Sequence, residues 1–504
     1  VVSPIDGTLL TQVAKGTAHD MNAAIAAART AFEDQRWAGQ PPQARKKVLL
    51  RWAELIEDNA LELAVLGVRD NGTEIAMALK AEPGSAAGTI RYYAEALDKV
   101  YGEIAPTSGD VLGLVHKEPV GVVGAIIPWN FPLMIGAWKI GPALAMGNSV
   151  VVKPPETASL SLIRMAELGL EAGLPAGVLN VVTGEGAVVG QAMGLSMDVD
   201  ALVFTGSGGT GRRLLEYAAQ SNLKRVYLEL GGKSPNMVFA DAPDLDEAAK
   251  VAAHGIFRNS GQVCVAGSRL LVEDTIHDDF VRAVVKAAEA MRVGDPLETT
   301  TQIGAINSEP QLRQNLSFVE TAKNEGGQVE TGGTQILTET GGYYMAPTVV
   351  TGVRPDATLA QKEVFGPVLG VTPFSSDDEA VRGLDLEPWP GAPHGGRYPV
   401  RHHSREHLWR VRPDRTVGGR RTIRQWPRQI HARFGQVCGS QNRMDQTITP
   451  PSRGEIQMSE KSILVVGTYD TKDDELAFLA DVIRDQGGQV KTMDVSVLGD
   501  PSNP

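Results

Sequence analysis

The stretch VGVVGAIIPWNFP, residues 120–132, decides the fold class of this chain together with the apolar residues that follow it up to Met146. Its β-branched start predicts a strand over 122–127, and two prolines bound the turn that follows. By its length the whole apolar run also fits a membrane span. The run is interrupted, however, by Pro128, Trp129, Asn130, Pro132 and Lys139. We therefore expect a buried strand, a turn and a buried helix, and no membrane partner.

Strand-like and helix-like segments alternate after this stretch. The expected strands are rich in β-branched residues and cover 122–127, 149–153, 178–183, 201–205 and 226–229. The helical segments between them predict a parallel sheet with helices on both faces. A second α/β stretch follows over 240–374.

The residues before the stretch show two other patterns. Apolar residues recur every three or four positions over 21–32 and 46–66, so we expect residues 20–100 to be helical. Segment 101–118 alternates apolar and polar residues, which predicts a β-hairpin with its turn at Ser108-Gly109-Asp110.

Composition limits the possible partners and the compartment. The chain has 504 residues and a formal net charge of −12, which argues against a nucleic-acid partner because such proteins present a basic face. Two cysteines, Cys264 and Cys438, are too few for a disulfide framework, so we expect a reducing, cytoplasmic compartment. Because the chain begins Val-Val-Ser-Pro rather than with Met, we expect it to be incomplete at its N-terminus, and because no apolar leader opens it, we expect no signal peptide.

Three residues are candidates for covalent chemistry. Cys264 ends FRNSGQVC (257–264), although a lone cysteine is more often a packing residue than a nucleophile. A thiolate needs a base and oxyanion donors. Glu229, at the end of a strand in VYLELGGKSP (226–235), offers a base, although it fits a solvent-facing strand end equally well. Asn130 offers an N–H donor, although asparagine is more common as a turn former.

Two further motifs follow expected strands and carry groups suited to a dinucleotide. In FTGSGGTG (204–211), glycines open a helix whose backbone N–H groups attract phosphate. In KPPE (153–156), Lys153 and Glu156 are placed to hold ribose hydroxyls, and a carboxylate there disfavours the 2′-phosphate of NADP. The alternatives are a glycine-rich turn without a ligand and an exposed pair in a loop.

Taken together, these motifs resemble the aldehyde dehydrogenase superfamily over residues 1–382. The matching sequences are PWNFP (128–132), KPPE (153–156), FTGSGGTG (204–211), LELGGK (228–233), GQVC (261–264) and KEVFGP (362–367). The resemblance implies an α/β fold with a Rossmann-type NAD-binding domain over 1–230, which includes segment 101–118 as an oligomerisation hairpin. It also implies an α/β catalytic domain over 231–382 that is incomplete compared with the family.

The resemblance implies roles for single residues. Cys264 would be the nucleophile, Glu229 the general base and Asn130 the oxyanion donor in the NAD-dependent oxidation of an aldehyde to an acid, without a metal. Glu363 would contact the nicotinamide ribose, with Phe365 nearby. The full cofactor-binding set implied is Trp129, Lys153, Glu156, Gly206, Ser207, Gly211, Glu363 and Phe365. A CoA-acylating enzyme is one alternative, although that class generally lacks the base; a protein that binds NAD without turnover is another.

A narrower resemblance suggests the substrate. Segments 80–95 and 221–240 are similar to bacterial enzymes for γ-amino- and γ-guanidinobutyraldehyde, including the γ-glutamyl-aminobutyraldehyde type of putrescine breakdown. The substrate tunnel implied is lined by Phe131, Met134, Trp138, Val263 and Val265. Homodimers or homotetramers are implied too, although the strand that would join the hairpin lies in the missing part.

The resemblance ends near Arg382. Residues 383–457 contain 13 Arg and no Lys and show no helical or strand period, so we expect a disordered, out-of-frame translation. If the codons of Met444-Asp-Gln446 are read one nucleotide later, the genetic code requires Trp at the first position. It then permits Trp-Ile-Lys, a common family ending. Residues 422–430 shifted likewise allow QSGNGRDKS, which resembles the family's C-terminal motif.

The remaining residues, 458–504, resemble the start of a Rossmann-like unit of another protein. We expect a strand at 462–467 and a helix at 474–486. The alternative to a frame shift is a natural fusion with a disordered linker.

Sequencing the coding DNA around the codon for Arg382 tests the frame shift. We expect one nucleotide gained or lost there, whose correction restores a family-like C-terminal part. A continuous frame that encodes residues 383–457 as they stand would contradict it.

Overall fold

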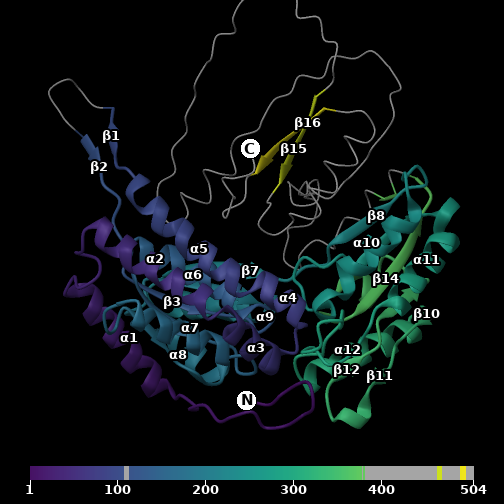
Figure 1. Cartoon of the computed structure of the whole chain (residues 1–504), viewed down its shortest axis with the longest axis horizontal. Coiled ribbons are helices and arrows are strands. Elements are labelled where there is room, and N and C mark those ends of the chain that lie inside the picture. Colours follow the sequence, from purple (N-terminus) through teal and green to yellow (C-terminus); the bar gives the residue numbers. More distant parts are fainter. Residues whose placement is uncertain (107–112, 377–378, 381–461, 468–488, 495–504) are drawn as a thin grey trace, which may run out of the picture.

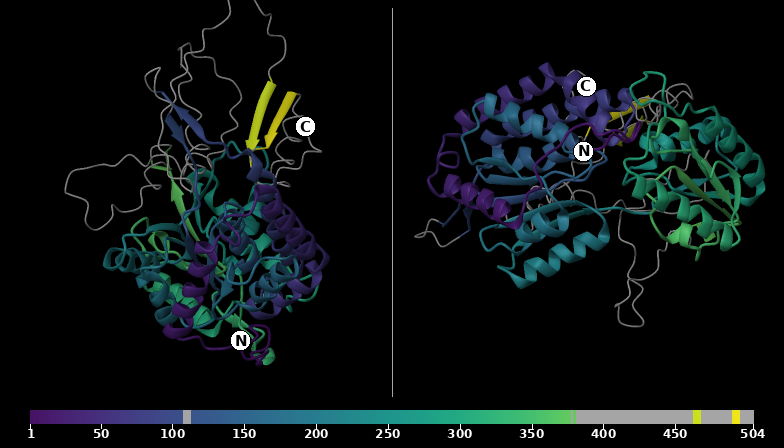
Figure 2. Two further views of the ribbon diagram at one scale, coloured as in Figure 1. Left: turned by 90° about the vertical axis from the view of Figure 1, so that its left-hand side faces the viewer. Right: turned by 90° about the horizontal axis from the view of Figure 1, so that it is seen from below.

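The computed structural model describes residues 1–106, 113–376, 379–380, 462–467 and 489–494. Within these residues, two five-stranded sheets each carry helices, and the two α/β units lie side by side (Figures 1 and 2). The predicted α/β fold class is therefore confirmed. The predicted turn at Ser108-Gly109-Asp110, segment 383–457 and the helix at 474–486 lie outside the described residues.

The first sheet has the strand order β5-β4-β3-β6-β7, and all its neighbouring strands are parallel. The strands are β3 (Val122–Ile126), β4 (Ser149–Lys153), β5 (Leu179–Val181), β6 (Ala201–Gly206) and β7 (Arg225–Leu230). All five predicted strands are confirmed, although β5 is shorter than expected. The order reverses between β3 and β6, and open α/β sheets bind their ligands beyond the carboxyl ends of the strands at such a point.

Alternating residues of β3 pack on opposite faces of this sheet. Val123 and Ala125 join the core beneath α2 (Pro42–Asp58), α5 (Pro83–Ala96) and α6 (Pro132–Ala145). Val122 and Ile126 join a second core beneath α1 (Ala18–Glu33). Because both faces are covered, every residue of β3 is buried, which explains its continuous apolar sequence. The remaining helices of this unit are α3 (Ala60–Asn71), α4 (Ile75–Ala81), η1 (Leu97–Lys99), α7 (Leu160–Glu171), η2 (Gly186–Gly190), α8 (Gln191–Leu195) and α9 (Gly208–Gln220).

The apolar run from Val120 to Met146 forms β3, a turn and α6, as predicted. Among the described residues, no helix is long and apolar enough to cross a membrane. The regular spacing of apolar residues over 46–66 predicts one continuous helix, but the structure has two helices there. There α2 ends at Asp58 and α3 begins at Ala60, with Asn59 between them at φ −106° and ψ 20°.

The second sheet has the order β10-β13-β14-β9-β8, with only β10 antiparallel to its neighbour. Its strands are β8 (Pro235–Val238), β9 (Arg269–Glu273), β10 (Gln328–Thr331), β13 (Thr348–Thr351) and β14 (Val368–Phe374). The chain passes from one sheet to the other between Leu230 and Pro235. The helices of this unit are α10 (Leu245–Phe257), η3 (Arg258–Gly261), η4 (Asp274–Ile276), α11 (His277–Ala290), α12 (Glu309–Asn324), η5 (Thr338–Thr340) and α13 (Thr358–Gln361).

Three small strand pairs complete the described structure. Strands β1 (Glu103–Ala105) and β2 (Gly113–Val115) pair antiparallel and project from the first unit, which confirms the predicted pairing (Figure 1). Strands β11 (Gln335–Ile336) and β12 (Tyr344–Met345) also pair antiparallel. The predicted strand at 462–467 is β15 (Ser462–Gly467), and it pairs in parallel with β16 (Gln489–Asp494).

Trp52 on α2 offers a test of this packing. Its side chain is fully buried, and its indole N–H donates to the carbonyl of Met165 at 2.8 Å. We expect Trp52→Ala to lower the free energy of unfolding by about 3–5 kcal/mol, because it leaves a cavity and removes the indole hydrogen bond. Urea unfolding followed by circular dichroism measures the change. Leu61→Ala, at a mostly exposed position, is the control and should change stability by less than about 0.5 kcal/mol.

Candidate active site

Cys264 lies in the loop between η3 and β9 and is a free, partly buried thiol. Burial raises the pKa of this thiol most, and the carboxylates of Glu363 and Glu229 raise it further. Hydrogen bonds from the backbone N–H groups of Cys264 and Val265 act in the opposite direction. The two carboxylates singled out in the sequence therefore lie close enough to act on the thiol.

Asn130 lies in the turn between β3 and α6, and its side chain is almost fully buried. Its side-chain NH2 group donates to the carbonyl of Gln262 at 2.9 Å, two residues before Cys264. An amide NH2 has two N–H donors, so this bond fixes the direction of the group while the second N–H remains for another acceptor. The turn after β3 and the loop of Cys264 thus meet, although 132 residues separate them.

The KEVFGP motif packs against both of these loops. A side chain at Gly261 would place its Cβ 2.1 Å from the carbonyl oxygen of Gly366, and Gly261 has a φ of +72°. Only glycine fits such a contact and such a backbone conformation without strain. The rings of Trp129 and Phe365 meet edge to face, with centroids 5.2 Å apart. Three of the predicted motifs therefore converge at one place.

Glu229 lies near the end of β7 and is exposed. Lys139 on α6 is its electrostatic neighbour: burial lowers the pKa of Lys139 to about 8, and the Glu229 carboxylate opposes this shift. In the sequence, Lys139 only marked an interruption of an apolar run. A lysine in an otherwise apolar helix is a sequence signal for a functional charge. The sequence does not show, however, that its neighbour is Glu229 on β7.

The KPPE motif begins at Lys153, the last residue of β4. The Nζ atom of Lys153, which is almost fully buried, is 2.8 Å from Oε2 of Glu156. The N–H of Gly186 donates to Oε1 of the same carboxylate at 2.7 Å. Burial alone raises the pKa of Glu156, but the charge and hydrogen bond of Lys153 outweigh this, so the pKa is lower than usual.

The glycine-rich motif joins β6 to α9, next to the reversal of strand order. Ser207 caps this helix, and its hydroxyl accepts the N–H of Thr210 at 3.3 Å. A Cβ at Gly211 would lie 3.0 Å from Leu230, so glycine allows α9 to lie close to β7. Gly206 is the last residue of β6. Backbone N–H groups at the start of α9 are donors and the Glu156 carboxylate is an acceptor, which are the kinds of group that hold the phosphates and ribose of a dinucleotide.

Glu363 lies over the segment that links the two sheets. The N–H of Gly232 donates to its Oε1 at 3.2 Å, and a Cβ at Gly231 would collide with its Oε2. Burial raises the pKa of Glu363, while the Gly232 N–H and Lys233 oppose the shift. Burial, followed by the charge of Arg269, lowers the pKa of Lys233 to about 7.

The predicted tunnel residues divide into two groups. Phe131 and Val263 are buried in one cluster of the second unit, and Met134 packs against it. Trp138 is 43% exposed and Val265 is 59% exposed. Met134 and Trp138 are four residues apart in α6, which places them on one side of the helix, and Phe131 directly precedes its first residue. Whether these five residues line one tunnel remains a prediction.

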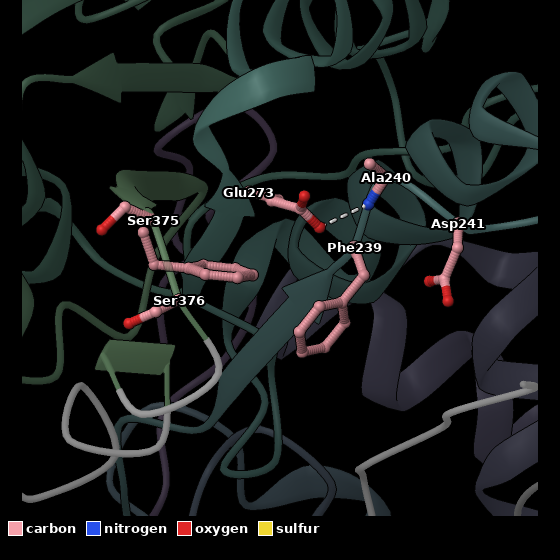
Figure 3. A pocket seen from close by; sticks show the side chains of 7 residues that line it. Phe239, Ala240, Asp241, Glu273, Ser375 and Ser376 are labelled. Atoms are coloured by element: carbon pink, nitrogen blue, oxygen red, sulfur yellow. Dashed lines mark hydrogen bonds between the residues drawn. The ribbon is translucent and has the colours of Figure 1, made fainter.

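A cavity of about 270 Å³ lies elsewhere, at the carboxyl ends of β8, β9 and β14 (Figure 3). It is lined by Phe239, Ala240, Asp241, Glu273, Phe374, Ser375 and Ser376. Glu273 turns toward Ala240 and accepts its N–H at 2.9 Å (Figure 3). None of the predicted site residues lines this cavity. In the part of the chain that the structure describes, no three His, Cys, Asp or Glu side chains gather as a metal site.

The fold is that of an α/β protein with an open parallel sheet of the kind that binds dinucleotides. The model of the aldehyde dehydrogenase family matches residues 1–385, and this chain belongs to that family. Residues 461–504 match the N-terminal domain of an uncharacterised protein family, UPF0261.

Individual relatives support the family assignment. The NADP/NAD-dependent aldehyde dehydrogenase PuuC of Escherichia coli strain K12 is 47% identical over 381 residues, 76% of each chain. The aminoacetaldehyde dehydrogenase of Pseudomonas aeruginosa is 45% identical over 75% of this chain and 76% of its own. The solved γ-glutamyl-γ-aminobutyraldehyde dehydrogenase of Burkholderia cenocepacia J2315 is 51% identical, with a TM-score of 0.74 over 76% of this chain and 77% of its own. An indole-3-acetaldehyde dehydrogenase solved with NAD+ has 49% identity and the same TM-score and coverage.

The effect of Glu363 on the thiol can be tested by alkylation. We expect Glu363→Gln to raise the rate of Cys264 alkylation by iodoacetamide severalfold below pH 8, because removing a negative charge lowers the thiol pKa and increases the thiolate fraction. Mass spectrometry of the Cys264 peptide across a pH series measures the rate. Glu247→Gln, on the exposed start of α10, is the control. An unchanged pH profile in Glu363→Gln would contradict the prediction.

Proposed function

We propose that this chain is an NAD-dependent aldehyde dehydrogenase that oxidises an amino- or guanidinobutyraldehyde to the acid through Cys264. The observation that carries the proposal is the hydrogen bond from Asn130 to Gln262, which places an oriented amide beside the loop of a partly buried thiol. The names of the relatives support the aminoaldehyde class.

In the first half of the proposed reaction, the Cys264 thiolate attacks the aldehyde carbon, and the carbonyl π electrons move to oxygen. The free N–H of Asn130 and the backbone N–H of Cys264 donate to this oxyanion. As the oxyanion collapses, the carbon loses a hydride and becomes a thioester. NAD, when bound, supplies the hydride acceptor.

In the second half, Glu229 takes a proton from water as the water attacks the thioester carbon. The carbon–sulfur bond breaks, the acid leaves, and the thiolate is restored. Lys139 is the electrostatic neighbour of Glu229 and lies beside the proposed base. The presence of this base speaks against the CoA-acylating alternative.

The cofactor groups would divide between the two units. Lys153 and Glu156 would hold the adenosine ribose, and Gly206, Ser207 and Gly211 would admit the pyrophosphate at the start of α9. Glu363 would hold the nicotinamide ribose, with Trp129 and Phe365 packed beside it. The ionised Glu156 would repel the 2′-phosphate of NADP, so NAD is the proposed cofactor.

The hairpin of β1 and β2 is the proposed oligomerisation element. Ile104 and Leu114 face each other across it and are 73% and 70% exposed, which suits an interface in a homodimer or homotetramer.

A second candidate function is NAD binding without turnover. It is favoured by the family match, which ends at residue 385 and covers 76% of each curated relative named above. This proposal takes residues 383–457 as an out-of-frame translation that replaces the family's C-terminal part. It takes residues 458–504 as the start of a separate unit.

NADH formation from NAD+ and 4-aminobutyraldehyde separates the two functions. We expect the unmodified chain to form NADH repeatedly. Cys264→Ala should lower the rate of NADH formation about 10³-fold or more. Glu229→Gln should still form the first equivalent of NADH but slow the later turnovers about 10²-fold. Glu247→Gln is the control. NAD binding without NADH formation in the unmodified chain would support the second function. 4-Guanidinobutyraldehyde and propanal, compared by kcat/KM, test the substrate class.

A further inference from the structure

The residues just before Cys264 adopt an unusual backbone. Asn259, Ser260 and Gly261 have φ values of 48°, 53° and 72°, which are all in the left-handed region. A residue other than glycine in this region costs on the order of 1–2 kcal/mol. Two such residues in succession need neighbouring groups that hold them in place.

Those neighbours come from segment 71–74, which contains the last residue of α3 and the connection to α4. The backbone N–H of Asn259 donates to Oε1 of Glu74 at 2.9 Å. The hydroxyl of Thr73 donates to the side-chain oxygen of Asn259 at 2.7 Å. All three residues are at most 4% exposed, so water does not replace these bonds in the folded chain.

The same segment also contacts the other loops of the site. The side-chain NH2 of Asn71 donates to the carbonyl of Trp129 at 3.4 Å, and the N–H of Ala305 donates to the carbonyl of Gly72 at 3.1 Å. The hydroxyl of Ser260 donates to the carbonyl of Gly304 at 2.9 Å.

From Asn259, the hydrogen bonds lead on toward the thiol. Its side-chain NH2 lies 3.4 Å from the carbonyl of Gln262, the same carbonyl that accepts from Asn130. The side-chain NH2 of Gln262 donates back to the carbonyl of Asn259 at 3.2 Å. The position of Gln262, and therefore of Cys264, depends on how Asn259 is held.

We propose that Thr73 and Glu74 are positioning residues, a clamp that holds the strained loop of the nucleophile through Asn259. The inference rests on the proposed role of Cys264 as nucleophile. Neither residue is within the sequence motifs that carry the family resemblance. Both act through Asn259, and what the loop needs from Glu74 is a hydrogen-bond acceptor at Oε1.

The burial of Glu74 indicates that its side chain acts as a hydrogen-bond acceptor and not as a permanent negative charge. Burial raises its pKa to about 7, with hydrogen bonds from backbone N–H groups, that of Asn259 first, acting against the shift. A carboxyl group accepts through its carbonyl oxygen whether or not it is ionised. Glutamine has the same oxygen, so it should serve as well.

Asp70 provides a matched control. It too is a buried carboxyl that accepts a backbone N–H, in this case that of Leu160 at the start of α7, at 2.9 Å. Like Glu74, it has one buried oxygen without a hydrogen-bond partner. Removal of its side chain costs stability in a similar way but leaves the bonds to Asn259 intact.

The test compares Glu74→Ala, Glu74→Gln and Asp70→Ala in the full chain. We expect Glu74→Ala to raise the alkylation rate of Cys264 about fivefold or more, because the loop relaxes and exposes the thiol. In turnover assays we expect its kcat to fall about tenfold with little change in KM. Glu74→Gln and Asp70→Ala should stay within about twofold of the unmodified chain in both measurements. Thr73→Val, with Thr73→Ser as its control, gives a second route if Glu74→Ala does not fold.

Three results would overturn the proposal. The first is an unchanged alkylation rate of Cys264 in Glu74→Ala or, if that variant does not fold, in Thr73→Val. The others are a loss of kcat in Glu74→Gln equal to that in Glu74→Ala, and a rise of the alkylation rate in Asp70→Ala equal to that in Glu74→Ala. If the unmodified chain forms no NADH, the proposed function fails instead. The alkylation rates still decide whether the clamp exists.

Discussion

The hydrogen bond from the Asn130 amide to the carbonyl of Gln262 joins the two α/β units at the place where the thiol lies. Both residues are almost fully buried, so loss of this bond would leave the Asn130 NH2 group without this acceptor and without water, at a cost of about 1–3 kcal/mol, while the Gln262 carbonyl would keep its longer contact with Asn259. The bond also orients the start of α6, whose Phe131 and Ile135 pack into the core of the second unit. The first sheet, through β3 and its turn, thereby contributes directly to the site formed by the second.

Close backbone contact is the second constraint on this site. Gly261 lies against Gly366, and a side chain at Gly366 would collide with Asn315 on α12. A side chain at Gly261 would displace the backbone of Gly366, and one at Gly366 would displace the side chain of Asn315. The loop of Cys264 is therefore enclosed by Asn130 on one side and by the Phe-Gly-Pro turn on another. This enclosure explains both the partial burial of the thiol and its raised pKa.

Buried ionisable groups are concentrated around these loops. Burial raises the pKa of Glu74 and of Glu82, in the latter case to about 8, and lowers the pKa of Lys139 and Lys233. Glu82 accepts the N–H of Met134 at the start of α6, as Glu74 accepts that of Asn259. Carboxyl groups from the helical region before the first sheet thus support the loops of the active site.

The sequence by itself determined the α/β class, the strands of the first sheet and the motifs that identify the family. These features are largely local, because apolar β-branched runs bounded by glycine- and proline-rich turns favour strands within a few residues of sequence. Only the tertiary structure decided which groups meet: Lys139 with Glu229, Glu74 with Asn259, and Trp129 with Phe365. The last two pairs are separated by 185 and 236 residues, and nothing in the pattern of either segment encodes its partner. Contacts of this kind arise from the packing of whole elements, which is why the clamp behind Cys264 became visible only in the folded chain.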